Sequence, residues 1–67
     1  MTHYIVEYLK WDEERNWAYW EVEACYDKLE SAVAYCADKD HDYYNIKAFQ
    51  EDKLVQEYEP NGEIFEE

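Results

Sequence analysis

Side chains alternate in character with a period of two over residues 4–11 and again over residues 17–24. Both runs are rich in aromatic and β-branched residues, and this combination predicts two β-strands. Residues 12–16 between them are polar and have the length of a hairpin loop, in which Asn16 best tolerates a left-handed backbone. The sequence therefore predicts a β-hairpin over residues 4–24.

Burial is expected to set the register of this hairpin. Tyr8 is predicted to lie opposite Trp20, and Val6 opposite Val22, because this pairing makes one continuous apolar face. A one-residue shift would carry a carboxylate onto that face. The opposite face is then predicted to mix large apolar and acidic side chains: Ile5, Glu7, Leu9, Trp11, Trp17, Tyr19, Glu21 and Glu23.

A helix is predicted after the hairpin. Asp27 can accept hydrogen bonds from the free N–H groups of the first turn, and Glu30 stands at the reciprocal capping-box position. The helix is expected to end within residues 38–40. Its apolar stripe has helical spacing and consists of Leu29, Ala32, Val33, Cys36 and Ala37. Cys36 on this stripe is expected to be a buried free thiol.

Two more strands are predicted over residues 43–49 and 54–58, joined by a tight turn at residues 51–52. The inward side chains of the first are expected to be Tyr44, Ile46 and Ala48. The Asn-Gly pair at residues 61–62 is a strong turn signal. Residues 64–65 are expected to add a short fifth strand or to dock as a tail.

The element order predicts a ββαββ fold of the α+β class. One helix would cover one face of an antiparallel sheet, in two layers. A chain of 67 residues has room for a single domain, spanning residues 1–67. The single Gly and single Pro argue against a loop-rich scaffold.

The charge of the chain is strongly unbalanced. Eighteen residues are Asp or Glu and six are Lys or Arg, a formal net charge of −12. A phosphate-binding face must be basic, so this balance argues against direct binding of nucleic acid or of a membrane and favours a positively charged protein partner. Crowded carboxylates are also expected to have raised pKa values, which would make the fold more stable as pH falls modestly from 7.

Cysteine content and hydropathy bear on the compartment. Two cysteines do not make a disulfide framework, and the sequence shows neither a signal peptide nor an apolar run of membrane-spanning length. A soluble protein of a reducing cytoplasm is expected.

An aromatic and acidic surface is the leading candidate for function. One helix can cover only one face of the sheet, so the other face must meet solvent or a partner. Its rings could stabilise the hairpin as cross-strand pairs, form a binding face for another protein, or form a homodimer face. The candidate binding residues are Glu7, Trp11, Asp12, Glu13, Glu14, Trp17, Tyr19, Glu21, Glu23, Asp38, Asp40 and Asp42.

Carboxylates spaced two residues apart on a strand form a short row of negative charge. Glu21 with Glu23 is such a row, and it could imitate a phosphate backbone in the Lys/Arg groove of a nucleic-acid-binding protein. The alternative is a solvated coat that promotes solubility.

Catalytic and metal-binding chemistry finds little support. The run from Asp38 to Asp42 opens like a calcium loop, but Tyr43 stands where Gly is needed and Phe49 where the closing Glu is needed. No CxxC or paired-His spacing occurs, Ser31 has no nearby base, and one Gly cannot build a phosphate-cradling loop. We expect no cofactor, no metal and no enzymatic activity.

In size, acidity and Tyr/Trp content, the whole chain resembles the small inhibitors encoded by phages and mobile elements, namely anti-CRISPR and anti-restriction proteins. Several of those act as nucleic-acid mimics. The resemblance is compositional, so it carries no residue-level motif. It implies a stoichiometric blocker of a host nuclease or surveillance complex that acts in the bacterial cytoplasm.

Overall fold

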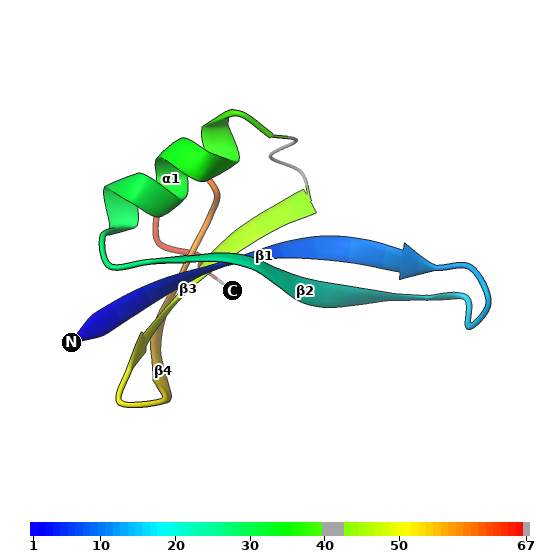
Figure 1. Cartoon of the computed structure of the whole chain (residues 1–67), viewed down its shortest axis with the longest axis horizontal. Coiled ribbons are helices and arrows are strands. Elements are labelled where there is room, and N and C mark those ends of the chain that lie inside the picture. The colour runs from blue at the N-terminus through cyan, green and yellow to red at the C-terminus, as the bar shows by residue number, and fades with distance from the viewer. Residues whose placement is uncertain (40–42, 67) are drawn as a thin grey trace.

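The computed structural model describes residues 1–39 and 43–66 as a sheet with one helix on it (Figure 1). The order of elements confirms the α+β class and the ββαββ succession. The elements are β1 Thr2–Asp12, β2 Trp17–Tyr26, α1 Leu29–Ala37, β3 Tyr44–Gln50 and β4 Lys53–Tyr58.

The four strands form one antiparallel sheet in the order β2-β1-β3-β4. β1 is therefore central, and β3 pairs with it through Val6 opposite Ile46. β3 and β4 are joined at Glu51 and Asp52, whose φ angles are 51° and 67°. This confirms a tight turn there, and shows that it forms from two non-glycine residues in the left-handed region.

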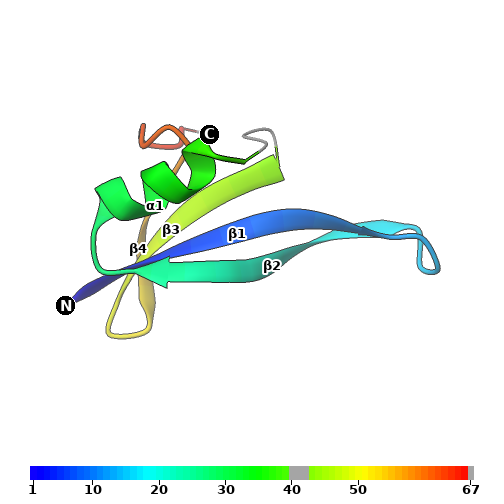
Figure 2. The same cartoon turned by 45° about the horizontal axis from the view of Figure 1, so that its top comes forward.

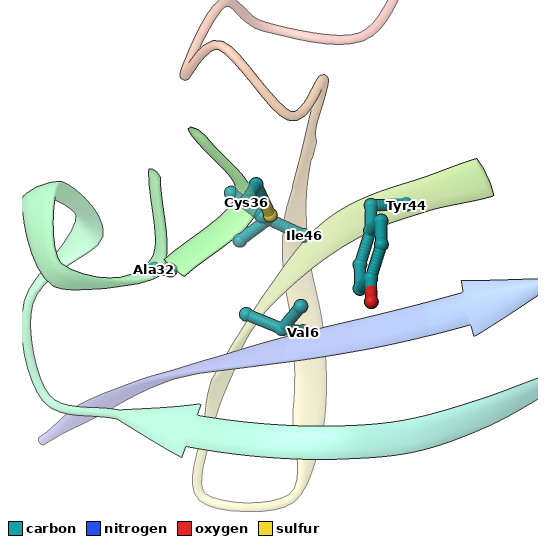
Figure 3. Close-up of a cluster of buried hydrophobic side chains, with 5 residues drawn as sticks. All are labelled: Val6, Ala32, Cys36, Tyr44 and Ile46. Carbon is teal, nitrogen blue, oxygen red and sulfur yellow. The ribbon is translucent and has the colours of Figure 1, made fainter. Parts of the chain in front are cut away.

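The core lies between α1 and the sheet (Figure 3). It is built from five buried side chains, which are Val6, Ala32, Cys36, Tyr44 and Ile46. Ala48 is buried as well, so the predicted inward residues of β3 are confirmed. Cys36 is a buried free cysteine, as expected. Ala37 is exposed, which shows that the apolar stripe turns away from the sheet in the last turn of α1.

The predicted N-terminal cap of the helix is wrong. Lys28 occupies the cap position in an extended conformation and makes no side-chain capping hydrogen bond. Asp27 lies one residue too early to cap, so Glu30 has no capping-box partner. We attribute the stability of α1 to its packing on the sheet, because a helix of nine residues is marginal on its own.

The predicted register of the first hairpin is also wrong. Val6 lies opposite Ala24, and Tyr8 lies opposite Glu21. The ladder shifts between Val6 and Glu7, where Glu23 is the extra residue of a β-bulge. The prediction assumed an unbroken ladder, in which side chains on one face stay on that face.

The bulge exchanges the two faces of β2 from residue 22 toward the turn. Trp20 pairs with Leu9 and Val22 with Glu7, which places both on the open face, the sheet face that α1 does not cover. On the other face, where the prediction did not place them, are Trp17, Tyr19 and Glu21. Glu23 also points to the helix side, where its carboxylate accepts hydrogen bonds from two tyrosines.

The outer part of the hairpin projects beyond the helix (Figures 1 and 2). The pairing of β1 with β3 stops at Tyr8, so residues 9–20 form a ribbon of two strands alone. We call this ribbon the arm. Its turn includes Asn16 at φ 55°, which confirms the expected left-handed residue.

The C-terminal segment returns along the outer edge of β4. Gly62 has a φ of 93° and lies so close to the helix that an added Cβ would stand 3.0 Å from Val33 Cγ2. Tyr58 and Ile64 form a single bridge, and the N–H of Phe65 donates to the carbonyl of Glu57 at 3.0 Å. The segment therefore docks as a tail with one bridge instead of forming a fifth strand.

Candidate functional site: the arm and the open face

The arm exposes large rings on both of its faces. Trp11 and Trp20 lie on the open face and are 58% and 42% exposed. Trp17 and Tyr19 lie on the opposite face, where Trp17 is 53% exposed. A ribbon of two strands has no second layer to cover either face, so these rings meet solvent on both sides.

Local hydrogen bonds close the tip of the arm. The Asp12 carboxylate accepts from the N–H groups of Glu14 at 3.0 Å and Arg15 at 3.3 Å. The Arg15 guanidinium lies 5.9 Å from the centre of the Trp17 ring. Asp12 thus shapes the turn, while Glu13 and Glu14 are exposed and have no ion pair within the part of the chain that the structure describes.

Two other candidate carboxylates are ion-paired. Glu21 lies 2.7 Å from the ammonium of Lys10, and this contact raises the Lys10 pKa through a hydrogen bond and charge attraction. Glu7 Oε1 lies 2.9 Å from Lys47 Nζ, outside hydrogen-bond geometry, so this attraction is mainly ionic. Each of these two carboxylates therefore already has a cationic neighbour within the protein.

Glu23 is tied to the body of the protein. Its carboxylate accepts hydrogen bonds from the Tyr35 hydroxyl at 2.8 Å and the Tyr44 hydroxyl at 3.0 Å. These bonds, the one from Tyr35 first, lower the pKa of Glu23, contrary to the expected effect of crowding. Burial and the same carboxylate raise the pKa of Tyr44 to about 12. The predicted row of Glu21 and Glu23 therefore does not present two free charges.

The structure brings together only part of the predicted site. Trp11, Asp12, Glu13, Glu14, Trp17 and Tyr19 all belong to the arm. Asp38 is exposed at the C-terminal end of α1, apart from the arm, and Asp40 and Asp42 fall outside the described residues. Over residues 1–39 and 43–66, no group of three His, Cys, Asp or Glu side chains is placed to hold a metal ion.

The sequence did not reveal a groove of about 610 Å³ on the open face. It runs from β2 across the sheet to the tail, and its lining includes Trp20, Asn45, Lys47, Glu57, Glu59 and Phe65. Only the inner strand order and the bulge bring them together, and neither leaves a local signal in the sequence.

The comparisons give no relative from which a role could be transferred. Neither a family model, nor a curated protein, nor a solved structure matches this chain. Among the described residues, no helix combines the length and hydrophobicity needed to cross a membrane.

Proposed function

We propose that this protein is a non-enzymatic inhibitor that binds another protein. Its acidic, aromatic arm would occupy the basic nucleic-acid-binding site of a nuclease or of a CRISPR or restriction complex in a bacterial cytoplasm. The observation that carries the proposal is the arm itself, a bare ribbon that exposes three indoles next to the unpaired carboxylates of Glu13 and Glu14.

Exposed indoles and carboxylates favour protein binding for different reasons. Trp and Tyr are the side chains most often found at energetic hot spots, and burying them removes much apolar area from water. The net charge of −12 would speed the encounter with a cationic surface and hold off nucleic acid.

Charge reversal at the arm tip tests this proposal. We expect Glu13→Lys with Glu14→Lys to weaken inhibition at least tenfold in cleavage assays against a panel of purified CRISPR nucleases and restriction enzymes. The matched control is Asp27→Lys with Glu30→Lys, the same change in charge at exposed positions near the start of α1. Circular dichroism verifies that both variants fold.

The dependence of affinity on salt is a second test of the proposal. Binding through arm carboxylates should weaken steeply between about 50 and 300 mM salt, since displaced ions return at high salt. Affinity that is flat over this range, or equal losses in the tip and control variants, would reject charge mimicry.

A homodimer is the second candidate, and the uncovered edge of β2 favours it. β2 is an outer strand of the sheet, and Trp20 and Val22 on its open face are 42% and 57% exposed. Two such edges could pair into a continuous sheet. Sedimentation velocity at high micromolar concentration tests this, and a monomer there removes the candidate.

A further inference from the structure

An aromatic side chain lies at each end of the open-face groove. The pairing of Leu9 with Trp20 places the indole on the open face at the β2 side. Phe65 follows Ile64, which bridges to Tyr58, and it lines the groove at the tail side. A planar group in the groove would find aromatic surface to pack against.

The floor of the groove carries excess negative charge. Lys47 and Glu57 are cross-strand neighbours, but the Lys47 ammonium is already held 2.9 Å from Glu7. Glu57 is half-buried and Glu59 is exposed, and neither has an ion pair in the described part of the chain. The groove is therefore matched to a cation.

One acceptor in the floor has no donor. Asn45 Oδ1 is shielded from solvent and receives no hydrogen bond within the described residues. Buried acceptors are rarely left unpaired, because the lost hydrogen bond to water is costly. The oxygen is closed to water molecules, so a ligand that donates a hydrogen bond in the groove would reach it once the partly exposed Asn45 side chain turns toward that ligand.

We propose that the groove binds an arginine side chain of the partner protein. A guanidinium is planar and can stack on Trp20 or Phe65, it carries positive charge for Glu57 and Glu59, and its five N–H donors can also serve Asn45. Anions would be repelled, and an uncharged ring would leave the carboxylates and the amide oxygen unpaired. A lysine supplies the charge without the flat donor surface.

This assignment deepens the proposed function and rests on it, since it names the side chain that a basic partner would insert. Trp20 belongs both to the arm and to the groove. A protein that binds the arm would therefore lie beside the groove. One of its arginine side chains could enter the groove as part of the same interface.

Blocked tripeptides test the groove without knowledge of the partner. ¹⁵N NMR titrations would follow the Trp20 indole and the Asn45 side-chain amide with Ac-Gly-Arg-Gly-NH2 and its lysine and citrulline counterparts. We expect saturable shifts with arginine, at least threefold weaker binding of lysine, and none with citrulline, which keeps the shape but lacks the charge. Equal binding of citrulline, or no shift at Trp20 and Asn45 with arginine, would overturn the assignment.

Free L-arginine separates a protein side chain from a metabolite. Its α-ammonium and α-carboxylate offset each other in charge, so we expect it to bind no more tightly than the blocked peptide. Tighter binding of the free amino acid would overturn the assignment to a protein partner.

Isosteric variants locate the binding. Glu57→Gln with Glu59→Gln should weaken the arginine peptide at least fivefold. The matched control, Glu63→Gln with Glu66→Gln, changes the same charge on exposed tail residues that do not line the groove, and should change affinity less than twofold. Equal losses would show a diffuse effect of charge and overturn the site. These titrations use the isolated protein, so peptide binding can fail while inhibition through the arm persists. Inhibition can likewise fail while peptide binding persists.

Discussion

The inner part of the molecule and the arm are built from the same two strands but follow different rules. From Tyr4 to Tyr8, β1 has neighbouring strands on both sides and a helix above it, and Val6 there is fully buried. Beyond Tyr8 the strand has one neighbour and no cover, and Trp11 is 58% exposed. Large apolar side chains are thus placed for folding in one region and left available in the other.

If the arm binds a partner as proposed, this difference would separate stability from binding within one short chain. Substitutions in the body should act on the free energy of unfolding, whereas substitutions in the arm should act on partner affinity and leave the fold intact.

The largest loss is expected from Ile46→Ala in the body. Ile46 is fully buried against Val6 and Cys36, and removing such a side chain costs about 2–5 kcal/mol. Urea unfolding followed by circular dichroism measures the change. Val55→Ala on the half-exposed edge of β4 is the control and should cost less than about 1 kcal/mol. Similar losses at both positions would mean that the core is not where burial places it.

Gly62→Ala is expected to cost about 1–2 kcal/mol. Its φ of 93° is unfavourable for a side chain, and the new Cβ would press on Val33 of the helix. Asn16→Gly at φ 55° in the arm is the counterpart and should leave thermal stability unchanged or slightly raised. A neutral Gly62→Ala variant would show that the tail is not docked on α1.

Tyr44→Phe is expected to cost about 1 kcal/mol, because it removes a hydrogen bond to Glu23. The lowered pKa of Glu23 means that its contribution to stability is present above its ordinary pKa of 4.5 and is lost as pH falls below it. The raised pKa of Tyr44 means that its contribution is complete below pH 10 and is lost as pH rises toward about 12.

Urea unfolding of the unsubstituted parent protein and of Glu23→Gln, from below pH 4.5 to above pH 10, checks the direction in which stability changes with pH. The parent should lose stability faster than Glu23→Gln below pH 4.5. A parent that becomes more stable on acidification below that pH would show that repulsion among carboxylates outweighs the two tyrosine hydrogen bonds.

The smallest effect on stability is expected from Trp11→Ala and Trp17→Ala, each less than about 1 kcal/mol. Their rings are more than half exposed, so little buried area is lost. The free energy of binding to a nuclease that the protein inhibits should nevertheless weaken by about 2 kcal/mol or more, as for a hot-spot residue. Normal inhibition with either variant would leave the arm without a role in binding.

Local patterns predicted the body of the fold. Alternation in β3 placed Tyr44 and Ile46 inward, and helical spacing placed Cys36 in the core, because both signals lie within one element. The faces of β2 were missed because they depend on a contact between distant residues. No local feature marks Glu23 as a bulge until the hydroxyls of Tyr35 and Tyr44 are seen beside it.

Some features of the candidate site could likewise be predicted from the sequence, and others could not. The acidic loop with Trp11 and Trp17 beside it was visible as a run of residue types. The pairing of Glu7 with Lys47 was not, since it needs the position of β3 beside β1. The groove joins Trp20 to Phe65 across the sheet, so only the strand order could reveal it.

The bulge at Glu23 determines which β2 side chains of the arm face the helix side of the sheet. An unbulged ladder would pair Tyr8 with Val22 and Lys10 with Trp20, and would turn these β2 side chains over to the helix side. The two alternatives differ by one residue of slippage. Only the bulged ladder places Glu23 on the helix side, so we expect its hydrogen bonds with Tyr35 and Tyr44 to favour that ladder. In a variant with both tyrosines changed to Phe, cross-strand NMR contacts between Lys10 and Trp20 should appear as the unbulged ladder becomes populated. The β2 side chains of the arm would then lie on the opposite face.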